Sequence, residues 1–339
     1  MGPVAPVAPV APVAPAAPVS RAGPGRANER PFIVRFVNMS GEPIRCTHLP
    51  AGGVRLHVAQ AGQGSPVLML HGFPDHWELW RPLMAELCAD HRVLAPDLRG
   101  INLSDKPPAV SDYAIAHLVD DVRALIAHLG GRCALVGHDW GGLLAWTVAA
   151  QHPDAVSRLV VFNAPHPCRF AEELQASPRQ REASAYAQRL CQAGAADRLA
   201  RDDFERLWAV RADGRARADC PAWAARRSAC VQAWSQPGAL QAALNWYRAL
   251  NLEAALAPEG VRSVPELGQA SGVVDVPTLV VWGERDGSFP VACLQGLERW
   301  VPDLRVHREP AGGHWLLEER PALAASLLRD FLAFPAPKD

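Results

Sequence analysis

Residues 135–146 read LVGHDWGGLLAW, in which an apolar strand end runs into a short polar turn and then into an apolar helix start. This is the outline of a nucleophile elbow, which projects its central side chain above the edge of a sheet and usually carries serine there. Here the central residue is Asp139, and a carboxylate with a reference pKa of about 3.9 is ionised at neutral pH without an adjacent base. Attack on an acyl group would yield only an unstable anhydride, whereas displacement at an sp3 carbon yields a covalent alkyl ester. Asp139 therefore predicts a substrate with an electrophilic sp3 carbon.

Two further residues have the types needed to hydrolyse such an ester, which requires a histidine that activates water and a carboxylate that orients it. The sequence LVVWGERDGSFP places Asp286 in the loop after a strand pattern, and EPAGGHWLLEERP places His314 before the last helix. Taken singly, a loop aspartate is usually a turn or cap residue, and a loop histidine is often only structural. The order nucleophile, acid, base is that of the α/β-hydrolases, so the three residues together predict a triad.

The stretch LHGFPDHW (70–77) follows another strand pattern and turns sharply at its Gly-Phe-Pro segment. Backbone N–H groups in such a turn and directly after the nucleophile can bind a developing oxyanion. We therefore expect the N–H groups of Phe73 and Trp140 to form an oxyanion hole, the alternative being that HGFP is only a tight turn. Phe73, Trp140 and Trp315 are also expected to line the substrate pocket, with core filling as the alternative for the two tryptophans.

These residues need a sheet that brings strand ends together, and the hydrophobic pattern supplies one. From about residue 45, short and almost continuously apolar runs alternate with longer amphipathic ones, as in a parallel sheet covered on both faces. The predicted strands are 54–59, 66–71, 91–96, 133–138, 158–163, 277–283 and 304–309. The predicted helices are Trp80–Leu87, Ile115–Leu129, Gly142–Gln151, Ala292–Trp300 and Ala322–Phe334. This alternation favours a doubly wound α/β fold.

The alternation fails between about residues 165 and 272, where the sequence is rich in Ala, Arg and Trp and has helical periodicity. We interpret this stretch as a helical insertion that covers the carboxyl ends of the strands, where such sheets bind ligands. The Arg-rich part, 211–227, is expected to form a solvated helix face. The predicted organisation is a disordered Pro/Ala/Val-rich tail (1–30), a first part of the α/β core (31–165), a helical cap (166–272) and a second part of the core (273–339).

Composition excludes several classes of function. The 339 residues are 49% hydrophobic and 20% charged, which is typical of a folded globular protein, and the net charge of −1 gives no sign of a nucleic-acid partner. The eight cysteines are scattered without zinc-site spacing, which favours reduced thiols, a cytoplasmic location and no metal. No apolar run approaches the roughly 18 residues needed to span a membrane. The Pro-Val-Ala repeat of 1–30 is expected to be a flexible, polyproline-II-like tail and lacks signal-peptide features.

From about residue 45 to the C-terminus, the chain resembles the epoxide hydrolases of the α/β-hydrolase fold, which are related to haloalkane dehalogenases. The matching stretches are HGFPDHWELWR (71–81), PDLRGINLSDKP (96–107), GHDWGG (137–142), NAPHP (163–167), NWYR (245–248), WGERD (282–286) and GGHW (312–315). The resemblance implies a mostly parallel, doubly wound sheet with an inserted helical cap. It also implies Asp139 as nucleophile, His314 as base, Asp286 as its partner, and a cis peptide bond between Phe73 and Pro74.

Opening an epoxide also requires a donor for the departing oxygen, and a tyrosine in an apolar pocket suits this role. The chain contains only three tyrosines, two of them in the inserted region. Tyr247 stands in NWYR, which is similar to the family's cap motif. Tyr186, in ASAYAQRLCQAG, resembles the family's first cap tyrosine, judged by its distance to Gly194. Both are expected to bind the epoxide oxygen, the alternative being half-buried aromatic residues of the cap.

The nearest rival is a haloalkane or haloacid dehalogenase, which uses the same Asp–His–Asp chemistry. A dehalogenase often has Asn where this chain has Phe73, and a fluoroacetate dehalogenase would have Arg where it has Trp140, so both positions favour an epoxide. A serine esterase is disfavoured because the elbow lacks serine. A non-catalytic binding protein of the same fold would have lost a triad residue, and none is lost here.

The sequence therefore predicts an epoxide hydrolase that forms a vicinal diol through an ester on Asp139, hydrolysed by water that His314 activates. The expected partners are a small apolar epoxide and water, with no cofactor, metal, nucleic acid or membrane span. The identity and stereochemistry of the epoxide, the pathway, residual dehalogenase activity, the role of the tail and the choice between monomer and homodimer do not follow from the sequence.

Overall fold

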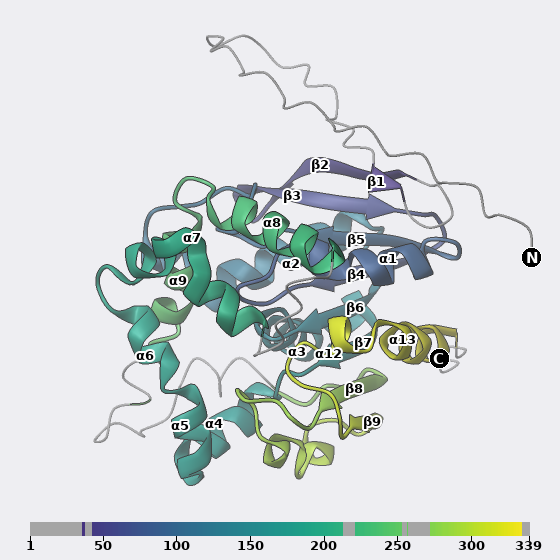
Figure 1. Cartoon of the computed structure of the whole chain (residues 1–339). Helices are drawn as coiled ribbons and strands as arrows, with labels where there is room; N and C mark the ends of the chain where they lie inside the picture. The colour runs from purple at the N-terminus through teal and green to yellow at the C-terminus, as the bar shows by residue number, and fades with distance from the viewer. Residues whose placement is uncertain (1–35, 38–42, 213–220, 253–255, 257–271, 334–339) are drawn as a thin grey trace, which may run out of the picture. The chain divides into compact units, whose positions relative to one another are not determined.

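The computed structural model describes residues 36–37, 43–212, 221–252, 256 and 272–333, so the predicted tail at 1–30 lies outside it. Within the described residues the strands form one sheet in the order β1-β2-β3-β5-β4-β6-β7-β8-β9 (Figure 1). The strands are β1 (Phe36–Val37), β2 (Pro43–Ala51), β3 (Val54–Ala61), β4 (Ser65–Leu70), β5 (His91–Pro96), β6 (Cys133–His138), β7 (Val156–Phe162), β8 (Thr278–Gly283) and β9 (Leu304–Glu309).

The sheet is parallel from β5 to β9 and antiparallel where β1, β2 and β3 join it. Every residue of β6 and β8 is buried, because helices cover both faces of the sheet and leave no solvent-facing side. The mostly parallel, doubly wound sheet predicted from these apolar runs is confirmed.

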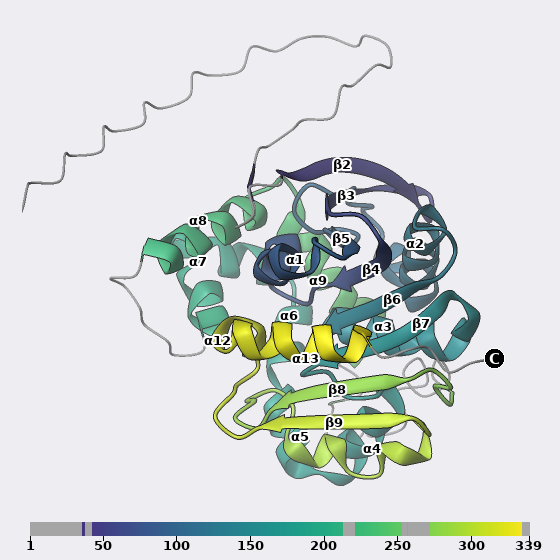
Figure 2. The same ribbon diagram turned by 90° about the vertical axis from the view of Figure 1, so that its right-hand side faces the viewer.

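Two layers of helices cover the sheet (Figure 2). On one face, α1 (Arg81–Leu87) and α13 (Pro321–Ala333) pack with the sheet in one apolar cluster, and α2 (Ile115–His128) and α3 (Trp140–Gln151) pack in a second cluster on the other face. Helix α2 buries residues at helical spacing, whereas α3 is apolar all round and buried on nearly all sides. The short helix α12 (Leu316–Glu319) precedes α13.

The described residues between β7 and β8 contain helices and no strand, as the loss of alternation predicted. We call α4 to α9 the cap helices; in Figure 1 α6, α7 and α9 lie at the left, and α4 and α5 lie at the bottom. Most of their apolar side chains form two further clusters, and Ala242 and Trp246 of α9 pack into one of the clusters of the sheet. The cap helices are α4 (Pro167–Ala176), α5 (Pro178–Ser184), α6 (Tyr186–Cys191), α7 (Ala195–Ala212), α8 (Pro221–Trp234) and α9 (Ala239–Ala249).

Two local predictions were wrong. The helix expected at Ala292–Trp300 is a pair of 3-10 turns, Val291–Leu294 and Leu297–Arg299, because Gly296 between them adopts a left-handed φ of 72° that interrupts an α-helix. Strand β2 was not predicted, since prolines at both of its ends obscure its alternating pattern.

Candidate active site

Asp139 lies at the elbow between β6 and α3, with φ 53° and ψ −122°. Such a positive φ is strained for a residue with a side chain and holds the carboxylate above the sheet edge. The turn depends on Gly141, where an added Cβ would lie 2.1 Å from the carbonyl oxygen of Leu70. The local structure expected from GHDWGG is therefore present.

The loop after β4 contacts Asp139 directly. The N–H of Phe73 donates to Asp139 Oδ1 at 2.9 Å, and the Phe73–Pro74 peptide is cis, as expected. Gly72 permits this approach, because a Cβ there would lie 2.2 Å from Asp139 Oδ1. One Asp139 oxygen is thus held by the predicted oxyanion loop.

His314 lies between β9 and α12 and joins the two carboxylates. Its Nδ1 is 2.8 Å from Asp286 Oδ2, and its Nε2 is 3.6 Å from Asp139 Oδ2. The first separation is a hydrogen bond and the second exceeds one. The structure therefore brings the three predicted triad residues together, with Asp286 orienting the histidine and Asp139 on its other side.

Asp286 is held by groups that the sequence analysis did not assign. Its Oδ1 accepts from the backbone N–H groups of Ser288 at 2.7 Å and Phe289 at 2.9 Å. Its Oδ2 accepts from Asn163 Nδ2 at 2.8 Å. Asn163 directly follows β7, so its place at the same sheet edge as the triad was the signal that could have found it.

Opposing influences set the protonation of the histidine and its partner. Burial lowers the pKa of His314, but the negative charges of Asp286 and Asp139 outweigh burial and raise that pKa well above its usual value. Burial likewise raises the pKa of Asp286, yet His314 and the hydrogen bonds to the carboxylate lower it below its usual value. The pair therefore favours an imidazolium next to an ionised carboxylate while Asp139 is also charged.

The predicted tyrosines reach the same site from two cap helices. Tyr186 begins α6 and Tyr247 lies in α9, and their rings are 6.3 Å apart. The ring of Tyr247 also contacts Trp140 edge-on at 4.9 Å. Burial, followed by the charge of Asp139, raises the pKa of Tyr186, and burial raises that of Tyr247, so both hydroxyls keep their protons.

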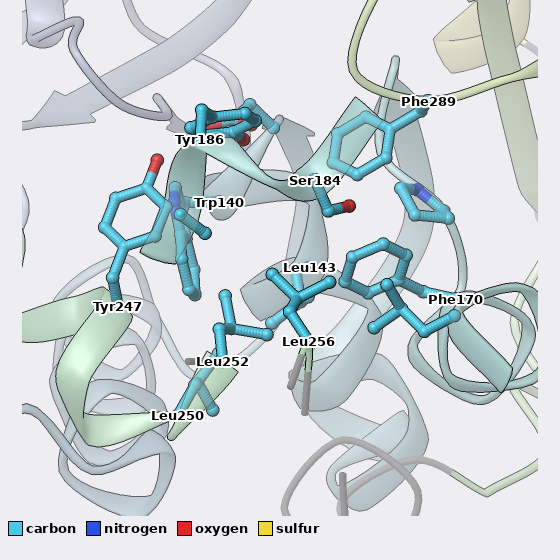
Figure 3. A pocket seen from close by; sticks show the side chains of 14 residues that line it. Trp140, Leu143, Phe170, Ser184, Tyr186, Tyr247, Leu250, Leu252, Leu256 and Phe289 are labelled. Carbon is cyan, nitrogen blue, oxygen red and sulfur yellow. The ribbon is translucent and has the colours of Figure 1, made fainter. Parts of the chain in front are cut away.

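A cavity with two arms surrounds Asp139 and the two tyrosines. The narrow arm has a volume of about 40 Å³ and the wide arm about 260 Å³. Figure 3 shows Tyr186, Tyr247 and Trp140 on one side of the narrow arm and two phenylalanines opposite them. Trp315 and Phe73 line the wide arm. The predicted pocket residues therefore lie around the nucleophile.

A buried ion cluster ties the cap helices to the sheet beside the site. Arg211 of α7 and Arg226 of α8 both contact Asp75, at 3.0 and 2.8 Å, and both also pair with Glu318 of α12. Trp315 Nε1 donates to Asp75 as well, at 2.8 Å. The expectation that the 211–227 arginines form a solvated face was wrong for these two, because carboxylates distant in sequence neutralise them.

The remaining buried polar residues near the strand ends have structural partners. His71 Nε2 accepts from the N–H of Leu98, and His138 Nε2 donates to the carbonyl of His314. Asp97 accepts from His57. Among the described residues no group of His, Cys, Asp and Glu is placed to hold a metal, and no helix there is long and apolar enough to cross a membrane.

Comparison with known proteins agrees with this geometry. A family model described as the alpha/beta hydrolase fold matches residues 65–321. The chain is 38% identical over 289 residues to epoxide hydrolase 3 of Xenopus tropicalis, covering 83% of this chain and 75% of that protein. It is 33% identical to the AB hydrolase superfamily protein YfhM of Bacillus subtilis, covering 85% and 98%.

Solved structures show the same likeness. The crystal structure of an epoxide hydrolase from Bacillus megaterium in complex with an inhibitor aligns with a TM-score of 0.78 at 32% identity, covering 85% of this chain and 100% of that one. Together with the elbow and the residues gathered around it, these matches place the chain in a single family. It belongs to the epoxide hydrolases of the α/β-hydrolase fold.

Proposed function

We propose that the protein converts an epoxide to a vicinal diol through a covalent ester on Asp139. The observation that carries the proposal is the position of Asp139, with His314 on one side and two protonated tyrosine hydroxyls in the same cavity. In a dehalogenase the leaving group is a halide, which needs hydrogen-bond donors. In an epoxide the leaving group is an alkoxide oxygen, and two tyrosines that keep their protons suit such an oxygen.

In the first step, Asp139 Oδ2 attacks an epoxide carbon, because Oδ1 is already engaged by the N–H of Phe73. A carbon–oxygen bond to the carboxylate forms, the ring carbon–oxygen bond breaks, and Tyr186 or Tyr247 supplies a proton to the released oxygen and regains one from solvent. The two hydroxyls, which both line the cavity, bind the oxygen before the bond breaks and stabilise the charge that develops on it.

In the second step, His314 removes a proton from water, and the resulting hydroxide attacks the carbonyl carbon of the ester. Esterification abolishes the charge of Asp139, one of the two carboxylates that raise the pKa of His314, so the histidine becomes a base only after the ester has formed. The N–H groups of Phe73 and Trp140 bind the oxyanion. When it collapses, the bond between the carbonyl carbon and the alkyl oxygen breaks, His314 returns its proton to that oxygen, and the diol leaves with an oxygen from Asp139.

Single-turnover labelling tests the proposal. Excess enzyme is mixed with styrene oxide in 18O water, and the diol and the Asp139 peptide are analysed by mass spectrometry. We expect an unlabelled diol and label in Asp139. Label in the first-turnover diol and none in Asp139 would show direct attack of water. Halide release from a haloalkane without any diol from styrene oxide would identify a dehalogenase instead.

A further inference from the structure

His138 is the last residue of β6 and directly precedes Asp139 at the elbow. It is buried, with 1% of its surface exposed, and neither of the two proposed chemical steps uses it. It lies beside His314, because the two rings are 4.9 Å apart and tilted by 49° to each other. The proposed base therefore has a second imidazole as its immediate neighbour.

A hydrogen bond joins His138 to the backbone of this base. The Nε2 of His138 donates to the carbonyl oxygen of His314 at 2.9 Å. His314 lies between β9 and α12 and belongs to neither, so the regular hydrogen bonds of a strand or a helix do not fix its backbone. The bond from His138 ties this loop residue to β6, a strand inside the sheet whose end lies 176 positions earlier.

The partner of His138 determines its protonation. A carbonyl oxygen can only accept, so the Nε2 of His138 carries a proton. Its Nδ1 is buried and has no hydrogen-bond partner among the described residues, so a second proton there would be an unsatisfied donor. Burial and then the charge of His314 lower the pKa of His138, against the opposite effect of Asp139 and Asp75. His138 is therefore a neutral imidazole with a fixed tautomer.

These contacts fix His314 at two points. His138 holds its backbone carbonyl, and Asp286 holds its ring through Nδ1 at 2.8 Å. The Nε2 of His314 is left directed at Asp139, at 3.6 Å from Oδ2. The water that this nitrogen activates must meet the ester carbon of Asp139, and a displacement of ~1 Å can slow such a step by about 10²-fold. Because His138 is neutral, it holds the base without opposing the positive charge that the base acquires.

We propose that His138 is a positioning residue for ester hydrolysis: its neutral imidazole holds the carbonyl of His314 and thereby keeps the base directed at the ester on Asp139. This inference rests on the proposed ester mechanism and adds a residue to which that mechanism assigns no role. Because His138 acts through the base, it matters for hydrolysis of the ester and little for its formation. A histidine that only filled space beside the elbow would contribute its shape and not its donor.

Two substitutions of similar length separate the donor from the shape. His138→Gln keeps an N–H group near the position of Nε2, whereas His138→Met has no donor. Each variant reacts with styrene oxide in a single turnover, and intact-mass spectrometry after rapid quenching gives the rate constants of ester formation and of ester hydrolysis. We expect His138→Met to slow hydrolysis about 10²-fold and to change formation less than about threefold. His138→Gln should restore hydrolysis to within about fivefold of the wild-type rate.

Two further variants complete the series. His166→Met controls for the cost of burying a methionine, because His166 is as deeply buried as His138 but stacks on Trp300 at 5.1 Å. Both of its rate constants should stay close to those of wild type. His138→Asn provides the comparison if methionine prevents folding, since its shorter side chain does not reach the carbonyl of His314. It should slow hydrolysis as His138→Met does.

The pH dependence of hydrolysis is a second readout. The charges that raise the pKa of His314 are those of Asp286 and Asp139, and a neutral His138 adds none. His138→Gln replaces one neutral group by another, so the midpoint of the hydrolysis profile should stay within about 0.3 pH units of wild type. A shift of about one unit or more would show that His138 titrates together with His314, and would overturn the inference.

The outcomes separate this inference from the function on which it rests. Equal slowing of both steps in His138→Met, normal hydrolysis in that variant, or failure of His138→Gln to restore hydrolysis overturns the positioning role and leaves epoxide hydrolysis intact. The absence of both covalent adduct and diol in wild type and in His138→Met contradicts the ester mechanism itself, and the inference falls with it.

Discussion

The sheet and the cap helices hold their parts of the site by different means. Asp139, Asp286 and His314 each follow a strand, and backbone groups fix them: Asp286 accepts two backbone N–H groups and Asp139 accepts one. Tyr186 and Tyr247 lie on cap helices, where they contact each other and Trp140 through side chains.

The two halves are also expected to serve different chemical steps. The sheet supplies the proposed nucleophile and base, whose alignment must be exact at the level of hydrogen bonds and is fixed by the fold itself. The cap supplies the proposed oxygen donors and part of the lining of both arms of the cavity, and it can vary in shape without disturbing the triad. Variants in the two halves should therefore impair different steps.

The largest effect is expected from His314→Gln in the sheet half. Removing the base blocks ester hydrolysis but leaves attack by Asp139 possible, so multiple turnover should fall about 10³-fold or more. Intact-mass spectrometry should show enzyme with one covalently added substrate. Asp139→Ala should show no adduct, and His117→Gln, at an exposed histidine of α2, should behave as wild type. Normal multiple turnover in His314→Gln would contradict the assignment.

Tyr186→Phe and Tyr247→Phe in the cap half should affect the other step. Each removes one donor to the leaving oxygen, so ester formation should slow by about 10²- to 10³-fold while hydrolysis of ester already formed is unchanged. Stopped-flow tryptophan fluorescence can follow both steps, since Trp140 contacts Tyr247. Tyr113→Phe is the matched control, because that hydroxyl donates to the Pro107 carbonyl outside the site. Slower hydrolysis with normal ester formation would reverse the proposed roles.

The buried ion cluster joins the two halves, and we expect a substitution there to affect turnover less and stability clearly. Arg226→Gln leaves buried Asp75 and Glu318 with less compensation and should lower the free energy of unfolding by about 3 kcal/mol. Its neighbour Arg227 pairs with Asp203 and Glu205 at the surface, so Arg227→Gln should cost about 0.5 kcal/mol or less. Urea denaturation followed by circular dichroism measures the free energy of unfolding of both variants. Equal losses in the two variants would show that the buried cluster contributes no more to stability than the surface pairs.

The sheet half was predictable because local rules determine it. Strand β6 with the elbow at Asp139 and strand β8 with the loop of Asp286 each combine an apolar run with a turn. Parallel pairing brings the carboxyl ends of these strands and of β9, which precedes His314, to one edge. Asn163 was missed as a partner of Asp286 because the two residues are 123 positions apart, and no local sequence pattern indicates that they pair.

The cap half was predictable only in outline. Its helical periodicity indicated helices, but the environment of Arg211 depends on Asp75 and Glu318, which lie 136 and 107 residues away. A charged stretch interleaved with Ala, Trp and Asp favours a solvated helix face in any local argument, and only the packed structure supplies the distant partners. The roles of Tyr186 and Tyr247 came from resemblance, since a lone tyrosine on a helix carries no chemical signal.

The smallest effect is expected in the pH dependence of the two chemical steps, which distinguishes the sheet half from the cap half without any substitution. Esterification of Asp139 removes one of the charges that raise the pKa of His314, so the histidine in the ester should lose its proton as pH rises. Because only the neutral histidine can act as a base, ester hydrolysis should accelerate about tenfold per pH unit below that pKa and then level off. Ester formation needs the tyrosines protonated, and their raised pKa values keep them so, which leaves this step nearly constant from about pH 6 to 9. Single-turnover fluorescence across this range measures both rates, and a hydrolysis rate that falls with rising pH would show that His314 acts as an acid in that step instead of as a base.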